Sequence, residues 1–101
     1  PVFFSLTTDR IIAINSVVMC DDGSARSRGL WVDPSFRGKG YARIVLENSI
    51  LQAKEWGAKH IWTVPRKSSW SSYQHVGFIQ KTDWFNEGVE FGPNCYASMM
   101  L

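Results

Sequence analysis

The sequence predicts an α/β (α+β) fold with one mixed central sheet and the element order β-β-β-α-β-α-β-β. Three observations predict it. The first third alternates β-branched runs with turn signals. After Gly40 the hydrophobic period lengthens to that of a helix. Two short apolar runs then end at Pro65 and Gly77. A strand–helix–strand series is typical of a parallel crossover, so we expect a sheet that is antiparallel at its ends and holds one parallel pair.

The first part of the chain reads as an antiparallel meander. Residues 2–6 are a short apolar run, and residues 11–19 are β-branched and long enough for a strand. The pair Asp22-Gly23 is a strong hairpin signal. Residues 25–32 then alternate between polar and apolar side chains. We therefore expect three consecutive strands joined by tight turns.

A single amphipathic helix follows over residues 40–56, and Gly57 is its expected stop. Polar residues occupy mostly the opposite face. The small and apolar face recurs every three or four residues, at Ala42, Val45, Leu46, Ser49, Ile50, Ala53 and Trp56.

The last part of the chain predicts a strand, a short helix and two further extended segments. Residues 60–64 form the strand. Ser68 or Ser69 can cap the helix. The remaining expectations are a helix face of Trp70, Tyr73 and Val76, a strand over 78–85, a turn at 86–88, and extended segments at 90–91 and 95–101 that are broken at Gly92-Pro93.

Composition limits what the protein can be. A chain of 101 residues with 45% hydrophobic residues suits one domain over residues 1–101. A net charge of +2 is too small to argue for nucleic acid, and no run is long enough to span a membrane. Cys20 and Cys95 show no metal-ligand spacing, so we expect reduced thiols, no metal and a cytoplasmic location. The chain begins at Pro1, so either the initiator was removed or the chain is a fragment.

The stretch between the meander and the long helix predicts an anion site. Gly38 and Gly40 let the backbone turn sharply, and a helix N-terminus behind such a turn presents unpaired N–H groups. Arg37, Lys39 and Arg43 add positive charge. The alternative is a strand-to-helix turn that uses its glycines for tightness only.

Three features together resemble the GNAT superfamily of acyl-CoA-dependent N-acetyltransferases. Residues 37–42 (RGKGYA) are similar to the family motif [Gln/Arg]-x-x-Gly-x-[Gly/Ala]. Residues 30–34 (LWVDP) are similar to the strand and proline that often precede it. Residues 73–78 (YQHVGF) are similar to the Tyr-x-x-x-Gly-Phe ending of the second helix. One departure is Arg66, where members often carry Asn.

The resemblance implies that acetyl-CoA or coenzyme A is the co-substrate. Its pyrophosphate would bind backbone N–H groups beside Arg37, and its pantetheine would lie between the diverging parallel strands. One backbone group there could also steady the oxyanion at the thioester carbonyl. The implied binding residues are Leu30, Trp31, Val32, Arg37, Gly38, Lys39, Gly40, Tyr41 and Ala42.

Tyr73 is the residue that the resemblance assigns to protonation of the leaving thiolate. The pKa of a phenol, near 10, and that of a thiol, near 8.5, are close enough for this exchange. The alternative is that Tyr73 is a core aromatic on a short helix. No general base is assigned, since Asp33, His75, Glu87 and Glu90 qualify by residue type only and His60 begins a strand, away from the crevice.

Members of the family usually begin with a strand and two helices ahead of the meander, and this chain has no residues for them. Those helices commonly help to form the acceptor pocket and cover the sheet. We therefore expect a twofold homodimer that hides residues 2–6, 11–19 and 95–101.

Three functions remain open. The leading one is acetyl transfer from acetyl-CoA to a primary amine of a small molecule or peptide. The second is a non-catalytic acyl-CoA-binding or interaction module of the same fold. The third is a small α/β domain that binds another phosphorylated ligand.

Overall fold

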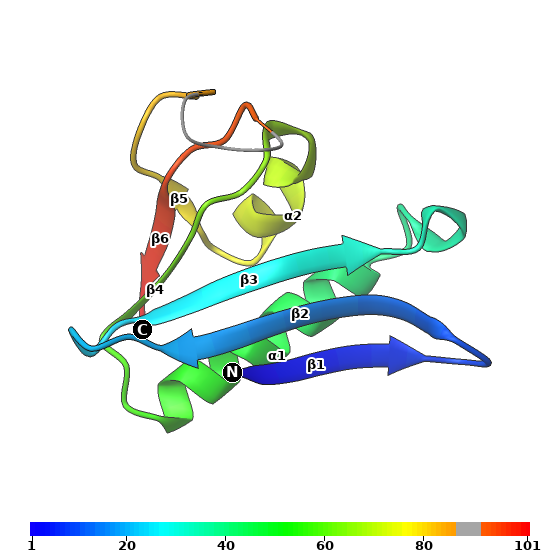
Figure 1. Cartoon of the computed structure of the whole chain (residues 1–101), viewed down its shortest axis with the longest axis horizontal. Helices are drawn as coiled ribbons and strands as arrows, with labels where there is room; N and C mark the ends of the chain where they lie inside the picture. Colours follow the sequence, from blue (N-terminus) through cyan, green and yellow to red (C-terminus); the bar gives the residue numbers. More distant parts are fainter. Residues whose placement is uncertain (87–91) are drawn as a thin grey trace.

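The computed structural model describes residues 1–86 and 92–101. In this part of the chain a 6-stranded mixed sheet carries two α-helices (Figure 1). The strand order is β1-β2-β3-β4-β6-β5, so β1 and β5 are the edges. The elements are β1 (Val2–Thr7), β2 (Ile11–Met19), β3 (Ala25–Val32), α1 (Tyr41–Glu55), β4 (His60–Thr63), α2 (Trp70–His75), β5 (Ile79–Gln80) and β6 (Ala97–Met100).

The predicted meander is confirmed. β1 pairs antiparallel with β2, and β2 pairs antiparallel with β3. The hairpin between β2 and β3 closes with hydrogen bonds from the Cys20 N–H to the Ser24 carbonyl at 2.8 Å and from the Gly23 N–H to the Cys20 carbonyl at 3.1 Å. Gly23 has φ +84°, a conformation that favours glycine. The Asp-Gly signal therefore marks the turn that sets the register of both strands.

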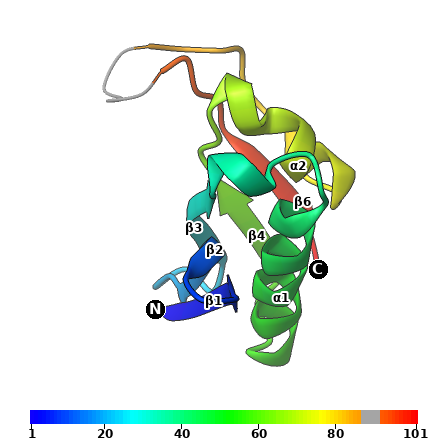
Figure 2. The same cartoon turned by 90° about the vertical axis from the view of Figure 1, so that its right-hand side faces the viewer.

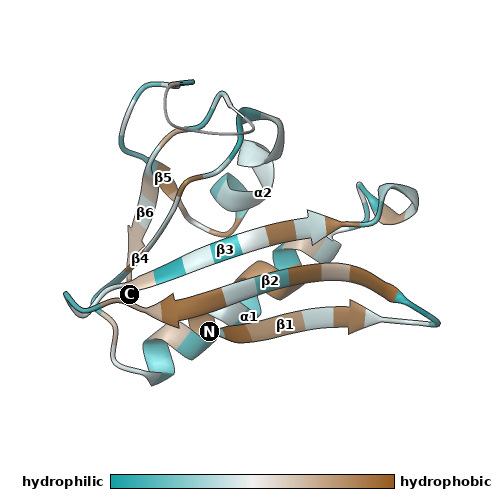
Figure 3. Ribbon diagram, in the orientation of Figure 1, coloured by the Kyte–Doolittle hydropathy of each residue, from teal (hydrophilic) through white to brown (hydrophobic). Residues whose placement is uncertain are grey.

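The long helix α1 covers one face of the meander (Figure 2). Its predicted apolar stripe is confirmed at the centre, where Val45, Leu46, Ile50 and Ala53 are buried. Ile61 of β4 is buried in the same core as Leu46 and Ile50. The opposite face of the three strands carries no helix in Figure 1 and shows apolar bands along β1 and β2 in Figure 3.

The predicted parallel pair is also confirmed, and it is short. β3 and β4 are in register at Ala25↔Ile61 and Arg26↔Trp62. The remaining residues of β3 run on without a partner in β4. The two strands therefore diverge toward their C-terminal ends, which is where ligands lie in sheets with parallel strands.

The expectation of a strand over residues 78–85 is wrong in its length, since only Ile79–Gln80 pairs with β6. Beyond it, the Lys81 N–H still donates to the Tyr96 carbonyl at 2.8 Å, and side-chain hydrogen bonds then interrupt the regular ladder. The Gln80 amide donates to the Thr82 carbonyl at 2.8 Å, and the Thr82 hydroxyl accepts from the Tyr96 N–H at 3.0 Å. Phe85 forms an isolated bridge with Asn94. The turn expected at 86–88 and the segment at 90–91 fall on or beside residues outside the described part.

Two smaller expectations need correction. Ser69 makes no side-chain cap hydrogen bond, because residues 67–69 already form a 3-10 turn that leads into α2. The strand expected from Cys95 begins at Ala97. Of the three strands expected to lie uncovered at a face or an edge of the sheet, β1 is a sheet edge, and β2 and β6 have neighbours on both sides. Cys20 and Cys95 are both free thiols.

Candidate active site

A cleft of about 620 Å³ opens between the end of β3, the start of α1 and α2. It lies where β3 and β4 diverge, so the topology of the sheet creates it. Its wall takes in eight of the nine binding residues that the sequence predicts, all but Lys39. The lining residues are Leu30, Trp31, Val32, Phe36, Arg37, Gly38, Gly40, Tyr41, Ala42, Arg43, Arg66, Ser68, Ser69, Ser72 and His75.

The wall at the start of α1 is a backbone turn, here called the glycine turn, residues 37–43. Gly38 has φ +76° and Gly40 has φ +81°, which other residues adopt only with strain. A Cβ on either glycine would meet no protein atom within 4 Å. Backbone conformation therefore favours glycine at both positions. No protein atom of the described residues would clash with a Cβ there, so only a bound ligand could require the space that the missing Cβ leaves.

The glycine turn presents free hydrogen-bond donors to the cleft. The first helical bond of this region runs from the Ile44 N–H to the Gly40 carbonyl at 3.4 Å. Among the described residues, the N–H groups of residues 38–43 have no acceptor. Unpaired N–H groups at a helix N-terminus carry partial positive charge and bind anions. The donors that the predicted anion site would need are therefore unpaired, and anion binding there stays a prediction.

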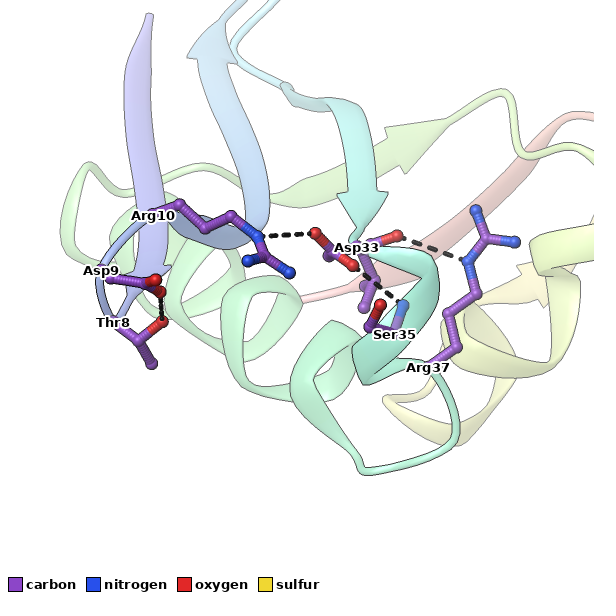
Figure 4. Close-up of polar contacts among 7 residues, drawn as sticks. Thr8, Asp9, Arg10, Asp33, Ser35 and Arg37 are labelled. Carbon is purple, nitrogen blue, oxygen red and sulfur yellow. Dashed lines mark hydrogen bonds and ion pairs between the residues drawn. The ribbon is translucent and has the colours of Figure 1, made fainter.

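Asp33 fixes the chain between β3 and the glycine turn (Figure 4). Its carboxylate accepts a hydrogen bond from the Ser35 N–H at 2.8 Å and another from Arg10 Nε at 3.1 Å. Its own N–H donates to the Ile12 carbonyl at 2.8 Å. The Ser35 N–H, with help from Arg10, holds the pKa of Asp33 below its usual value. Asp33 is therefore an anchoring carboxylate and a weak base.

The cations around the glycine turn are partly engaged with protein groups. Arg37 Nε donates to the Val32 carbonyl at 3.3 Å, and Figure 4 shows the rest of its guanidinium extending beyond that bond. Arg43 pairs with Glu47 at 2.9 Å on the exposed face of α1. Lys39 Nζ lies 5.4 Å from the ring centre of Phe36. No residue that lines the cleft in the described part is acidic, so the site favours an anionic ligand.

A small polar junction lies between β3 and β4, and its residues Ser27, Thr63 and Tyr73 do not line the cleft. The Thr63 hydroxyl of β4 donates to the Ser27 carbonyl of β3 at 3.0 Å. This bond lies just past the last paired residues, Arg26 and Trp62, so a side chain closes the ladder where the backbones separate. Thr63 also acts on Tyr73 of α2, where it lowers the pKa of the hydroxyl.

Tyr73 lies in the hydrophobic core and its side chain is 5% exposed. Its ring packs edge-on against Phe78 with centroids 5.6 Å apart. Burial raises the pKa of Tyr73 to about 12, against the lowering effects of the Thr63 hydrogen bond and the Arg66 charge. The hydroxyl is therefore a protonated donor at neutral pH, placed beside the divergence of β3 and β4.

The other titratable candidates are scattered. His75, which the sequence offered as a base by residue type only, lies on the cleft wall. His60 lines a separate depression with Asp22 and Trp62, away from the cleft, as predicted. Glu87 and Glu90 lie outside the described residues.

The sequence reasoning missed the wall that α2 and the segment before it contribute. This wall has one sequence signal. Polar side chains recur every three or four residues before and along the short helix. That signal becomes specific only once the helix is placed against the glycine turn. The missed lining residues are Arg66, Ser68, Ser69, Ser72 and His75.

Within residues 1–86 and 92–101, neither helix combines the length and apolar character needed to cross a membrane. The same part of the chain holds no cluster of three or more His, Cys, Asp or Glu side chains suited to a metal ion.

Comparison with known families assigns the family and the fold. The model of the Acetyltransferase (GNAT) family matches residues 2–78, which include the glycine turn, the cleft and Tyr73. The chain belongs to the GNAT family. No curated protein sequence matches this GNAT chain.

Solved structures share the fold at low identity. A candidate N-acetyltransferase from Lactobacillus plantarum has a TM-score of 0.81 and 18% identity, over 96% of this chain and 65% of that chain. The IAA acetyltransferase from Bacillus cereus has a TM-score of 0.81 and 16% identity, over 98% of this chain and 77% of that chain. A Bacillus subtilis acetyltransferase in complex with CoA has a TM-score of 0.75 and 20% identity, over 95% of this chain and 73% of that chain. This chain thus matches nearly whole, while it spans 65% of the first of these proteins.

Proposed function

We propose that this GNAT chain is an N-acetyltransferase that moves an acetyl group from acetyl-CoA to a primary amine by direct attack. The observation that carries the proposal is the glycine turn, with free N–H groups at a helix N-terminus in a cleft without acidic residues among those described. The proposed domain takes in the whole of residues 1–101, with cytoplasmic location supported by two unpaired thiols.

Coenzyme A fits the residues that line the cleft. Its pyrophosphate would accept hydrogen bonds from the N–H groups of residues 38–42, where the absence of a Cβ on Gly38 and Gly40 leaves room for close approach. Its pantetheine amides would bond backbone groups of residues 30–32, which have no strand partner in β4. The complex of the Bacillus subtilis acetyltransferase with CoA supports this class of co-substrate.

The proposed reaction needs no covalent enzyme intermediate. The neutral amine attacks the thioester carbonyl, and a backbone N–H among residues 30–32 stabilises the oxyanion. The C–S bond then breaks, the thiolate takes a proton from Tyr73, the amine nitrogen loses its proton to water, and water returns a proton to the Tyr73 oxygen. The Tyr73 hydroxyl stays protonated at neutral pH, but its pKa of about 12 lies further above that of a thiol, near 8.5, than the pKa of a free phenol does, so the transfer is less favourable than the sequence alone indicates.

One observation favours a second function, that of a non-catalytic acyl-CoA-binding module. The Tyr73 side chain is 5% exposed and belongs to the core cluster of Leu46, Ile61 and Phe78. A core tyrosine can be kept for packing alone. The two functions share the cleft and differ only in whether this hydroxyl meets a substrate.

Release of free thiol from acetyl-CoA, measured over a panel of small amines and peptides, separates the two functions. Amine-dependent release supports the transferase. Binding of coenzyme A without release over the whole panel supports the binding module. Absence of any coenzyme A binding at millimolar concentration contradicts both.

We also propose that the protein is a homodimer whose contact uses the helix-free face of the sheet. Phe3 of the edge strand is 64% exposed and Trp31 is 42% exposed on this face. Monomeric proteins seldom leave such a face open, and an edge strand invites pairing. The partner could then supply part of the acceptor pocket.

Sedimentation equilibrium tests the dimer. A mass of twice 11.5 kDa is expected, and a mass near 11.5 kDa at high concentration contradicts it. Phe3→Glu should lower the dimer fraction. Leu51→Glu is the matched control, because Leu51 is 60% exposed on α1, away from the proposed contact.

A further inference from the structure

A buried asparagine joins three elements beside the cleft. The Asn15 side chain of β2 is 0% exposed. Its Oδ1 accepts hydrogen bonds from the hydroxyl of Ser27 on β3 at 2.9 Å and from that of Ser49 on α1 at 2.6 Å. Its Nδ2 donates to the Arg28 carbonyl at 3.1 Å. Each bond satisfies a buried polar group that would otherwise be costly, so together they fix β2, β3 and α1 relative to one another.

Asn15 also lies opposite an irregularity of β3. Ser16 pairs with Arg28, and the next pair is Ile14 with Trp31, so β3 carries one residue more than β2 in this interval. Gly29 within it has φ +71°. An extra residue with a left-handed glycine is a β-bulge, which bends the strand and turns the residues after it in a new direction.

Side chains hold the bulge where the ladder is interrupted. The Arg28 carbonyl accepts from Asn15 Nδ2 at 3.1 Å and from the Ser16 hydroxyl at 2.9 Å. By strand alternation these two side chains reach the carbonyl from opposite faces of the sheet. The bulge is therefore restrained by two donors from β2, of which only Asn15 is also tied to α1 and to Ser27.

The residues directly after the bulge are the ones that line the cleft. Leu30, Trp31 and Val32 follow Gly29 and form the β3 wall. Their backbone orientation depends on the bend at Gly29, and the bend depends on the bonds to the Arg28 carbonyl.

We infer that Asn15 is a positioning residue for the acyl end of the cleft. It holds the bulge so that the backbone groups of residues 30–32 face the pantetheine arm and the thioester carbonyl. The inference rests on the proposed function, because it takes coenzyme A as the ligand. The inference adds Asn15, which touches no ligand itself but sets the geometry of residues 30–32, which would touch coenzyme A.

A fragment of the co-substrate separates positioning from general stability. Adenosine 3′-phosphate 5′-diphosphate carries the phosphates of coenzyme A and lacks the pantetheine arm. Its binding would use the glycine turn alone, whereas coenzyme A also uses residues 30–32. Titration calorimetry of both ligands therefore reports on the two ends of the cleft separately.

The variants are Asn15→Ala and Ser27→Ala, and the control is Ser24→Ala. Ser24 and Ser27 are each 1% exposed, and the Ser24 hydroxyl bonds to Asp22 at 2.6 Å, near the opposite end of β3. Asn15→Ala should weaken coenzyme A binding about tenfold, the loss of roughly one well-placed hydrogen bond. Ser27→Ala should weaken it less, and Ser24→Ala should leave it unchanged. The fragment should bind all variants as it binds the wild type.

Equal weakening of both ligands, or of neither, overturns the inference. If Asn15→Ala does not fold, Ser27→Ala decides by the same comparison of ligands. If the wild type binds neither ligand, the proposed function fails and this inference with it. If the wild type binds both ligands and the variants lose no preference for coenzyme A, only the inference fails.

Discussion

The glycine turn and Tyr73 are built into the fold differently. The glycine turn, residues 37–43, offers free backbone donors on an exposed segment whose shape depends on two left-handed glycines. Tyr73 places its hydroxyl in the core, is 5% exposed and does not line the cleft. The first can meet a ligand directly, whereas the second acts only if the thioester reaches between β3 and β4. Binding and chemistry are thus separable in this fold.

Removing the Tyr73 hydroxyl should have the largest effect, provided that turnover is found. Tyr73→Phe keeps the ring against Phe78 and should lower the rate by about 10²–10⁴-fold, as expected for loss of a general acid. Affinity for coenzyme A should stay unchanged, because the glycine turn is intact. Steady-state rates and calorimetry check both points. A rate equal to that of the wild type at every pH would make Tyr73 a packing residue only.

Altering the glycine turn should lower the affinity for coenzyme A, which the Tyr73 variant keeps. Gly40→Ala places a Cβ where the pyrophosphate would approach and strains a φ of +81°. Gly57→Ala is a matched control, with the same φ of +81° and likewise no protein atom within 4 Å. Both variants should lose a similar stability of about 1 kcal/mol.

Only Gly40→Ala should also lose coenzyme A affinity, by at least about tenfold, equivalent to 1.4 kcal/mol. Thermal denaturation with and without ligand measures both effects. A Gly40→Ala protein that binds coenzyme A as tightly as Gly57→Ala would place the phosphate site elsewhere.

The burial of Tyr73 predicts a specific dependence of stability on pH. The pKa of Tyr73 is about 12 in the folded protein and near 10 in an unfolded chain. Between these values the folded state holds the proton more often, so stability falls as pH rises, by up to about 1.4 kcal/mol per pH unit. Below pH 10 this contribution is fully present. Denaturant titrations from about pH 9 to about pH 11 should show a steeper loss for the wild type than for Tyr73→Phe, and parallel curves would contradict a buried hydroxyl.

The ion pair between Arg43 and Glu47 should matter least. Both side chains are exposed, and such pairs contribute about 0.3–0.5 kcal/mol. Glu47→Gln should change stability within that range and slightly raise coenzyme A affinity at low salt, because Arg43 is released toward the cleft. Calorimetry at two salt concentrations measures this change in coenzyme A affinity. A large loss of affinity would mean that Glu47 orients Arg43 for binding.

The sequence predicted the conformation of the glycine turn because that conformation is local. Arg37, Gly38 and Gly40 act through backbone conformation and charge within a few residues of chain. The parallel pair and the helix α1 were likewise predictable, since hydrophobic period and turn residues determine them. Asp33 and Arg10 show the limit, since residues 23 positions apart meet only through the fold.

The second wall of the cleft could not be predicted for a similar reason. Ser72 and His75 became cleft residues only when α2 was placed against the glycine turn. The strand over 78–85 was overestimated because side-chain bonds of Gln80 and Thr82 interrupt the ladder, and the Thr82 bond reaches Tyr96 only in the folded chain. Alternating polarity does not reveal such competition.

The central claim is that the backbone of the glycine turn binds the pyrophosphate of coenzyme A. Amide chemical shifts of the labelled 101-residue protein, recorded by NMR during titration with coenzyme A, test it most directly. The largest shifts are expected at the N–H groups of residues 38–42, with smaller ones at residues 30–32. Shifts confined to other parts of the molecule, or none at millimolar ligand, would contradict the claim.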